Sequence, residues 1–257
     1  TIGPVITLKG ESSITLEVGS AYNDAGATAN DSFEGDLSAG VTSSGTVDAT
    51  KTGTYEIKYN VSDSTGNKAT ETIRTIVIED TTIPVITLVG EAEMSHEAAT
   101  DFTDPGATVT DNLDTNINVI STGSVDTRIP GSYTLTYAAT DAAGNKAVDV
   151  TRKVLVSDTT LPVITLDGEA DVTIEYGATY SDPGATAQDT LDGDITGIVQ
   201  SSGSVDTSKL GEYSIAFNVT DAAGNKAIEL SRKVTVVHST PPVILLVGED
   251  TMKVESG

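Results

Sequence analysis

The sequence predicts an all-β chain of tandem Greek-key β-sandwiches, and three observations support this. Pro-Val-Ile begins at Pro4, Pro84, Pro162 and Pro242, so the intervals are 80, 78 and 80 residues. Within each interval, apolar and polar residues alternate before a Gly-Asn turn, which is the pattern of a half-buried strand entering a hairpin. No segment has a convincing helical period. Repeats of this length indicate an array of small domains.

Further motifs keep the same register through the chain. The strongest is Asp141-Ala-Ala-Gly-Asn-Lys-Ala, which is repeated identically at residues 221–227 and with two changes from Asp63 onward. We therefore expect three complete domains and the start of a fourth. The predicted boundaries are 1–80, 81–158, 159–238 and 239–257.

The predicted strands follow from alternation. In the first repeat Tyr55, Ile57, Tyr59 and Val61 share one parity, and the equivalent positions of the other repeats are also apolar. A second apolar strand follows the Gly-Asn turn, which predicts a long hairpin. About seven short strands in 80 residues are typical of a small Greek-key sandwich.

The linkers between repeats are short and contain proline. They are residues 80–84, 158–162 and 238–242. Proline restricts the backbone, and so little chain leaves little room for a turn. We expect the sandwiches to form an extended rod. The fourth start holds one apolar segment, residues 243–247, which cannot fold alone.

Composition narrows the possible partners. The chain carries 14 basic and 38 acidic residues, a net charge of −24. A phosphate backbone or an anionic membrane surface requires a basic face, so we expect neither nucleic acid nor membrane insertion. The absence of cysteine excludes disulfides, which leaves a bound metal as the natural way to stabilise small extracellular domains.

Several motifs resemble a known family. These are Pro162-Val-Ile-Thr-Leu, Tyr180-Ser-Asp-Pro-Gly-Ala-Thr-Ala, Asp192-Gly-Asp-Ile-Thr and Gly211-Glu-Tyr, together with the Gly-Asn turn motif. The chain is similar to the bacterial Ig-like domain of cell-surface and pesticidal crystal proteins, a relative of hyalin-repeat and cadherin-like modules. The resemblance implies immunoglobulin-like sandwiches in extracellular multidomain proteins. The first repeat departs from the pattern, with Ala25 in place of proline.

Two acidic loops and the linker recur in every repeat. In a sandwich of this kind both loops lie at the pole where the chain enters, so we expect their oxygens to meet the linker aspartate there. Ca²⁺ takes six to eight oxygen ligands, so we expect one calcium site at each junction. The candidate ligands are Asp31, Glu34, Asp36, Asp63, Asn67, Asp80, Asp111, Asp114, Asn116, Asp141, Asn145, Asp158, Asp189, Asp192, Asp194, Asp221 and Asn225.

Turn chemistry is the alternative explanation for these loops, because Asp and Asn in glycine-rich segments commonly form turns without metal. Mg²⁺ would accept fewer protein ligands, and Zn²⁺ is disfavoured by the absence of cysteine and the presence of only two histidines. His238 stands where the other linkers have Asp. This favours a weaker last site, a pH-sensitive junction or drift in a surface linker.

Arg74, Arg152 and Arg232 fall on the inward parity of the last strand, which is unusual for a charged residue. We expect either a bulge or a pair with a buried acid such as Asp182. Repetition argues against catalysis, since no His recurs and no cleft is evident, so we expect no enzyme.

The expected function is a calcium-stiffened extracellular spacer or adhesion segment of a larger bacterial surface or secreted protein, monomeric and in contact mainly with its neighbouring repeats. A cell-surface glycan or protein is a further possible partner. The alternative is a glycan-binding accessory module of a secreted hydrolase or toxin.

Overall fold

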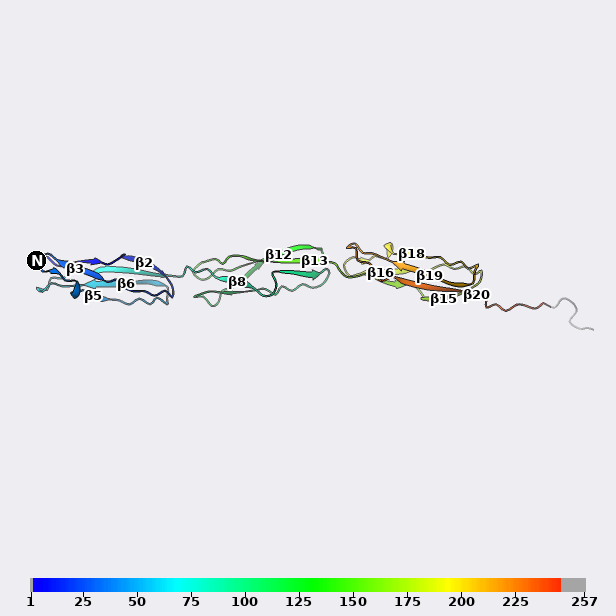
Figure 1. The fold of residues 1–257 in the computed structure, drawn as a ribbon, viewed down its shortest axis with the longest axis horizontal. Coiled ribbons are helices and arrows are strands. Elements are labelled where there is room, and N and C mark those ends of the chain that lie inside the picture. Colours follow the sequence, from blue (N-terminus) through cyan, green and yellow to red (C-terminus); the bar gives the residue numbers. More distant parts are fainter. Residues whose placement is uncertain (1, 246–257) are drawn as a thin grey trace, which may run out of the picture. The chain divides into compact units, whose positions relative to one another are not determined.

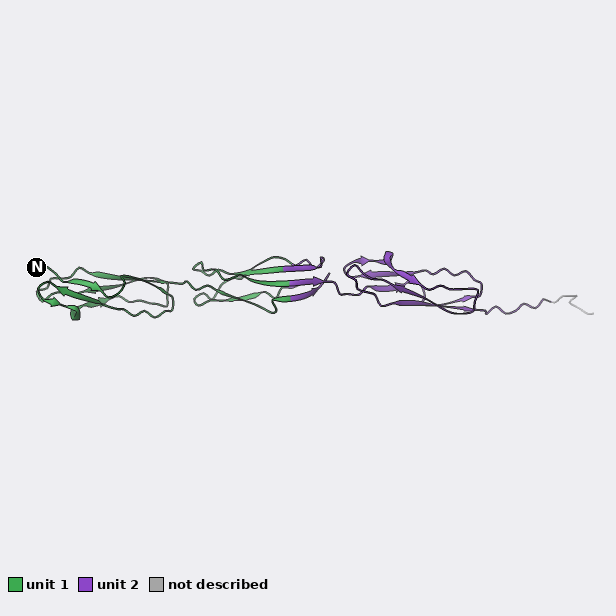
Figure 2. Ribbon diagram, turned by 45° about the horizontal axis from the view of Figure 1, so that its top comes forward, with its two compact units in different colours: residues 1–93, 104–124, 134–153 green, residues 94–103, 125–133, 154–257 purple. Residues whose placement is uncertain are grey.

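The computed structural model describes residues 2–245 of the chain. Contacts divide the chain into two compact units, residues 1–93, 104–124 and 134–153, and residues 94–103, 125–133 and 154–257 (Figure 2). The first repeat lies in the first unit and the third repeat in the second. The second repeat contributes residues to both.

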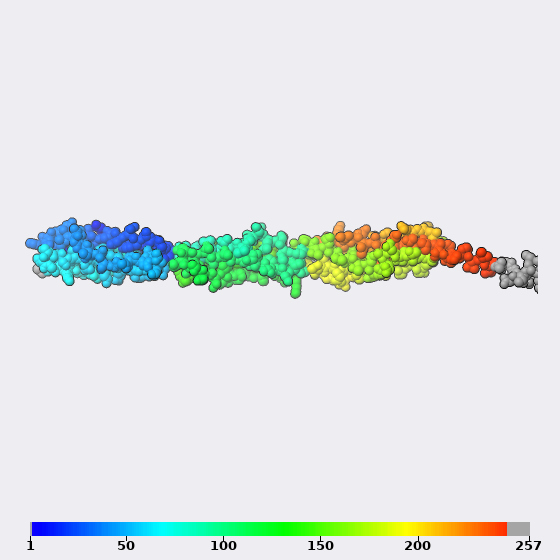
Figure 3. Space-filling model, turned by 90° about the horizontal axis from the view of Figure 1, so that it is seen from below, coloured from blue at the N-terminus to red at the C-terminus, as the bar shows by residue number. Residues whose placement is uncertain are grey.

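The first repeat is a sandwich of two sheets (Figure 1). One sheet has the order β1-β3-β4 and the other β2-β7-β6-β5. Strand β2 pairs parallel with β7, so blue and cyan segments lie side by side in Figure 3. The elements are β1 (Val5–Leu8), β2 (Ser13–Glu17), β3 (Ala27–Asp31), β4 (Gly35–Asp36), the 3₁₀ turn η1 (Ser38–Gly40), β5 (Thr42–Ser44), β6 (Gly53–Asn60) and β7 (Thr72–Glu79).

The third repeat reproduces this topology, with sheets β14-β16-β17 and β15-β20-β19-β18. Its elements are β14 (Val163–Leu166), β15 (Asp171–Glu175), β16 (Ala185–Asp189), β17 (Gly193–Asp194), the 3₁₀ turn η2 (Thr196–Ile198), β18 (Gln200–Ser202), β19 (Gly211–Asn218) and β20 (Leu230–Val237). The predicted all-β, Greek-key sandwich class is therefore confirmed.

The second repeat has the sheets β10-β8 and β11-β12-β13-β9. Within residues 2–245, it lacks counterparts of β4 and η1. Its elements are β8 (Val85–Leu88), β9 (Glu93–Glu97), β10 (Ala107–Thr110), β11 (Ile120–Thr122), β12 (Gly131–Ala138) and β13 (Val150–Ser157).

The long hairpin forms the core of each repeat as predicted. In the first repeat β6 and β7 pair antiparallel, and Ile57, Tyr59, Ile76 and Ile78 cluster with their side chains buried. The apolar positions of the alternating pattern thus face the core, and the polar positions between them face solvent. In the third repeat the sequence predicts that Ile228, Leu230, Arg232, Val234 and Val236 face inward. This holds from Arg232 onward but is wrong for Ile228, which precedes β20, and for Leu230, its first residue, both of which are exposed.

A buried arginine in each sandwich pairs with an aspartate. The inward position of this arginine is therefore explained by an ion pair, one of the two expected alternatives. Arg74, Arg152 and Arg232 are fully buried. Their Nη1 atoms contact the carboxylates of Asp24, Asp104 and Asp182, respectively. The Nε and Nη2 atoms donate to backbone carbonyls; Arg152 Nε, for example, donates to the Glu91 carbonyl at 3.0 Å. A buried charge is tolerated when it is paired and hydrogen-bonded in this way.

The predicted start of a fourth repeat is described only in part. Residues 242–245 form no strand, and the remainder of the expected apolar segment lies outside the described residues. Within residues 2–245 we find no helix of the length and apolarity that crossing a bilayer requires.

Candidate metal centres at the repeat junctions

Each repeat junction gathers carboxylates from one linker and two loops. We define the first junction by linker residue Asp80 and the loops around Asp114 and Asp141, all within the first unit. Carboxylate oxygens of these three residues lie within 4.8 Å of one another. Oxygens on opposite sides of a Ca²⁺ ion at its usual bond lengths are about 5 Å apart, so one ion could touch all three.

The second junction repeats this arrangement within the second unit. Asp158, Asp192 and Asp221 bring their carboxylate oxygens within 4.8 Å of one another. Asp158 and Asp221 are buried, as Asp80 and Asp141 are at the first junction. Two junctions built from different linkers therefore place the same residue types in the same positions.

In the first acidic loop of the second and third repeats, one oxygen of the first aspartate closes the turn and the other has no hydrogen-bond partner among the described residues. Asp111 Oδ1 accepts the backbone N–H groups of Leu113 at 2.9 Å and Asp114 at 3.0 Å, which closes the loop after β10. Its Oδ2 is buried without a hydrogen-bond partner. Asp189 Oδ1 closes the third repeat's loop in the same manner, and its Oδ2 is likewise unpartnered. Turn formation thus accounts for Oδ1 of each aspartate but not for the burial of its Oδ2.

Other buried oxygens at the junctions also have no partner within the described chain. They are Oδ2 of Asp80, Asp158 and Asp221. Leaving an anionic oxygen buried without a partner costs free energy, because water no longer solvates it. A cation held between the carboxylates would remove that cost.

The electrostatics agree with this geometry. Burial raises the pKa of Asp80, and the neighbouring carboxylates Asp111, Asp141 and Glu17 raise it further. The pKa of Asp158 is raised by burial and by Asp189 and Asp221. A raised aspartate pKa means that ionisation destabilises the folded junction, so this cost appears as the pH rises through the raised pKa and is absent in acid.

Asparagine side chains fasten the linkers to the hairpin loops. Asn145 Nδ2 donates to the Asp80 carbonyl at 3.0 Å and to Asp141 Oδ2 at 2.9 Å. Asn225 Nδ2 donates to the Asp158 carbonyl at 3.2 Å. In the first repeat, Asn67 Nδ2 instead donates to Thr65 Oγ1 and Asp63 Oδ2. The recurring Asn therefore holds the backbone of the linker, with its amide oxygen left as a possible ligand.

The first repeat carries the same loop pattern at its own pole. Asp31 Oδ2 is buried and unpartnered, and Glu34 accepts the Ser64 N–H at 3.1 Å. Asp114 and Asp192 accept the equivalent N–H groups of Ala142 and Ala222. Glu34 thus occupies the position of an aspartate in the other repeats.

Three predicted ligands are used elsewhere. Asp36 accepts hydrogen bonds from Ser38, and Asp194 accepts one from Thr196 at 3.0 Å, where they stabilise the starts of η1 and η2. Asn116 is exposed and donates only to Thr115 among the described residues. Asp36 and Asp194 are the last residues of β4 and β17, and none of the three belongs to the carboxylate groups described above.

Sequence reasoning missed a glutamate at the end of the preceding repeat's second strand. Glu17 accepts hydrogen bonds from Thr81 N–H at 2.8 Å, from Thr82 Oγ1 at 2.8 Å and from Asn112 Nδ2 at 3.0 Å. At the second junction, Glu97 accepts hydrogen bonds from the N–H groups of the equivalent threonines, Thr159 and Thr160. The signal was available, since Glu17, Glu97 and Glu175 keep the spacing of the repeat.

Hydrogen bonds to this glutamate favour its ionised form. Those from Thr159 and then Thr160 lower the pKa of Glu97 to about 2. A lowered pKa contributes stability above the unfolded value of 4.5, and this contribution is lost as the pH falls through about 2. At neutral pH the glutamate therefore holds the linker in place.

Replacing Glu97 by alanine is expected to free the second linker. The amide N–H groups of Thr159 and Thr160 would lose a charged acceptor, so we expect their hydrogen exchange to accelerate about fivefold. Exchange measured by NMR tests this, with Glu93→Ala on the same strand as the control because Glu93 is exposed. Unchanged exchange at both amides would contradict a role for Glu97 in holding the linker.

Comparison with known proteins identifies the repeat. The family described as bacterial surface protein, Ig-like domain, matches residues 6–78, 86–156 and 164–236. Pesticidal crystal protein Cry22Aa of Bacillus thuringiensis is 31% identical over 228 residues, which cover 83% of this chain and 31% of that protein. Hyalin of Strongylocentrotus purpuratus is 30% identical over 199 residues, covering 70% of this chain and 16% of hyalin.

Solved structures with Ig-like architecture are more distant. Drosophila N-cadherin EC1-4 aligns with 92% of this chain and 76% of its own, at 13% sequence identity and a TM-score of 0.32. The chain spans less than half the length of the curated relatives it matches. The three family matches cover most of the chain and confirm the resemblance inferred from its motifs. The chain therefore belongs to the bacterial surface protein Ig-like domain family and contains three copies of that domain in tandem.

Proposed function

We propose that this chain is a calcium-stiffened extracellular spacer segment, in which one Ca²⁺ ion at each junction joins two successive Ig-like repeats. The observation that carries the proposal is the convergence of three carboxylates, one from the linker and two from the following repeat, within 4.8 Å. Membership of a bacterial surface family supports an extracellular location. The net charge of −24 supports cation binding over binding of polyanions.

The donor set suits calcium. Every group at the junction offers oxygen, as carboxylate or carbonyl, and Ca²⁺ prefers oxygen ligands in a flexible arrangement. The unpartnered Oδ2 atoms of Asp80 and Asp111 are available at the first junction, and those of Asp158, Asp189 and Asp221 at the second. A bound ion would supply positive charge to these carboxylates.

Stiffening follows from which segments the ion would join. Asp80 precedes the second repeat by only a few residues, and Glu17 of the first repeat already accepts hydrogen bonds from the linker and from Asn112. An ion on Asp80, Asp114 and Asp141 would fix the remaining side of the same linker. The chain between two sandwiches would then have few free torsions, so bending at the junction would be restricted.

Calcium titration by calorimetry tests the proposal. We expect the Asp80→Asn variant to lose one site and the Asp80→Asn/Asp158→Asn variant to lose two, over the range of about 0.1–1 mM typical of extracellular modules. Asp36→Asn is the matched control, because Asp36 contacts Ser38 outside the cluster. Identical binding by the double variant and the unmodified chain would refute the junction sites.

The stiffening itself needs a separate measurement. Small-angle scattering is expected to give a smaller radius of gyration in chelator than in calcium, because cation-free junctions bend. The Asp80→Asn/Asp158→Asn variant should show the chelated value under both conditions. A radius that ignores calcium, in a chain that binds it, would remove the mechanical role and leave the metal sites.

A further inference from the structure

The second repeat differs from the other two in the loop beside its candidate metal centre. Gly123 follows Asp111 by 12 positions, whereas the equivalent glycines, Gly45 and Gly203, follow their aspartates by 14. The longer loops form β4 with η1 and β17 with η2. In the second repeat, residues 111–119 are all described and form neither strand nor 3₁₀ turn.

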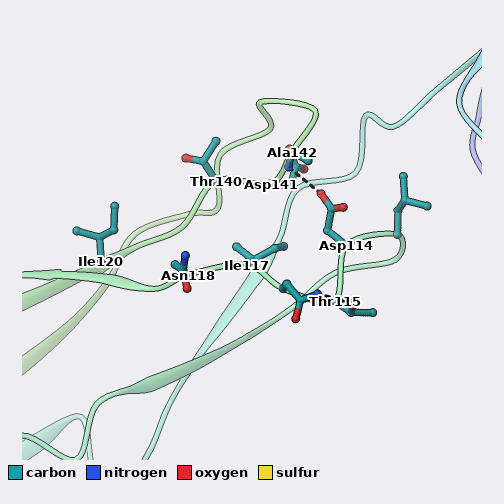
Figure 4. A pocket seen from close by; sticks show the side chains of 10 residues that line it. Asp114, Thr115, Ile117, Asn118, Ile120, Thr140, Asp141 and Ala142 are labelled. Atoms are coloured by element: carbon teal, nitrogen blue, oxygen red, sulfur yellow. Dashed lines mark hydrogen bonds between the residues drawn. The ribbon is translucent and has the colours of Figure 1, made fainter.

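The shortened loop also loses its attachment to the neighbouring strand. In the first repeat the Ser38 hydroxyl accepts the Ala29 N–H at 3.1 Å, and in the third repeat Thr196 accepts the Ala187 N–H at 3.0 Å. Among the described residues of the second repeat, no side chain from 115–119 makes such a bond. That segment leaves a pocket of about 540 Å³, lined by residues 113–118, Ile120 and residues 140–142 (Figure 4).

The lining has the character of a site for a small polar molecule. Asp114 and Asp141 offer carboxylates, Asn116 and Asn118 offer amides, and Ile117 provides an aliphatic wall (Figure 4). The volume lies in the range of small-molecule sites, about 300–1,000 Å³. The lining contains two carboxylates and no basic residue, so an anion would be repelled. An apolar molecule would leave the amides without partners.

The pocket and the candidate ion share two residues. Asp114 and Asp141 line the pocket and also belong to the carboxylate group with Asp80. Asp141 is more than nine-tenths buried, and Asp80, whose buried Oδ2 has no hydrogen-bond partner among the described residues, belongs to the same group. A cation held there would therefore border the pocket. Hydroxyl groups are oxygen ligands of the kind that Ca²⁺ accepts.

We infer that the pocket of the second repeat binds a neutral sugar ring, with its hydroxyls turned towards the first-junction cation and its apolar face against Ile117 and Ile120. This inference rests on the proposed calcium site. Hydroxyls both donate to carboxylates and accept from amides, so one ring suits both kinds of polar group in the lining. In the third repeat a pocket of about 400 Å³ at the equivalent position is lined by Ile198, Gln200 and residues 218–220 and by neither junction carboxylate, so it would not bind the sugar beside a cation.

Titration of the ¹⁵N-labelled full chain with D-galactose, D-mannose and D-glucose in calcium chloride tests the inference. We expect at least one of these hexoses to shift the side-chain amide signals of Asn116 and Asn118 and the backbone signal of Ala142. Signals of Thr220, the third-repeat equivalent of Thr140, should not move. The shifts should disappear in chelator, because the cation is part of the site.

Two variants separate the sugar site from the calcium site. Replacing residues 115–119 with residues 193–199 of the third repeat restores the longer loop, so we expect hexose shifts to be lost while calcium binding is retained. Asn118→Ala removes one polar contact and should weaken hexose binding by about 2- to 10-fold. Calcium binding measured on the same samples keeps the two outcomes apart.

Each remaining outcome has a definite meaning. Calcium binding without any hexose shift overturns the pocket inference and leaves the proposed function intact. Hexose shifts that persist in chelator, or that survive the loop replacement, overturn it as well, as would shifts produced by D-galacturonate and by none of the neutral sugars. Failure of both calcium and hexose binding refutes the metal site from which the inference starts.

Discussion

Replacing Arg152 by methionine is expected to lower the free energy of unfolding of the second repeat by about 3–5 kcal/mol, because it leaves a carboxylate without its buried partner. The Arg152 side chain has no exposed surface, and that of Asp104 is 25% exposed. The guanidinium donates to Asp104 and Tyr137 and to the carbonyls of Glu91, Val89 and Gly106. Methionine fills much of the volume but satisfies none of these acceptors.

Urea denaturation of the full chain measures this effect, since the other two repeats keep their own arginines and serve as internal references. Lys153→Met is the matched control on the same strand, because the Lys153 side chain is 63% exposed and its ion pair with Glu93 is at the surface. We expect that change to stay within about 0.5 kcal/mol. Equal effects of the two substitutions would show that Arg152 is not a structural centre of the sandwich.

Replacing Gly123 by alanine should destabilise the second repeat by roughly 2–5 kcal/mol, from backbone strain and a steric clash together. Gly123 has φ +96°, a conformation that disfavours side chains, and a Cβ there would lie 2.5 Å from the Thr134 carbonyl oxygen. A Cβ at Gly45 would lie 2.1 Å from the Glu56 carbonyl oxygen, and one at Gly203 would lie 2.2 Å from that of Ser214. The recurring Gly before Ser/Thr-Val-Asp therefore marks a close approach to the central hairpin.

Gly144→Ala separates the strain from the clash. Gly144 has nearly the same φ, +97°, but a Cβ there would meet no atom within 4 Å. We expect a loss of about 1–2 kcal/mol from conformation alone. Thermal unfolding in chelator compares the two variants without any contribution from a cation. If Gly144→Ala lowers the free energy of unfolding as much as Gly123→Ala does, the clash with the Thr134 carbonyl does not contribute to the loss.

Most of the fold could be predicted from the sequence because it depends on local patterns repeated three times. Alternation at Tyr55, Ile57 and Tyr59 reported which side chains face the core, since a strand presents successive residues to opposite faces. The parity of Arg232 identified a buried charge, and its partner Asp182 was among the expected acids. The predicted inward positions were wrong at Ile228 and Leu230, because Leu230 is the last residue of β20 to pair with β19 and Ile228 lies beyond the paired segment.

The sequence predicted which types of residue form the candidate site, but not which individual residues belong to it. Asp114 belongs to the junction's carboxylate group and Asp111 helps to raise the pKa of Asp80, whereas Asn116 bonds only to Thr115 among the described residues, and residue spacing alone does not separate these roles. Glu17 was missed because its role depends on the linker folding back to its strand end, a contact between residues 64 positions apart.

The sequence by itself determined that the chain is a string of all-β domains with acidic loops in register, because periodicity and charge are properties of the order of residues. Only the tertiary structure decided which carboxylate oxygens are buried without partners among the described residues and that a pocket lies beside those of the first junction. Both depend on distances between segments far apart in the chain, and these are set by packing.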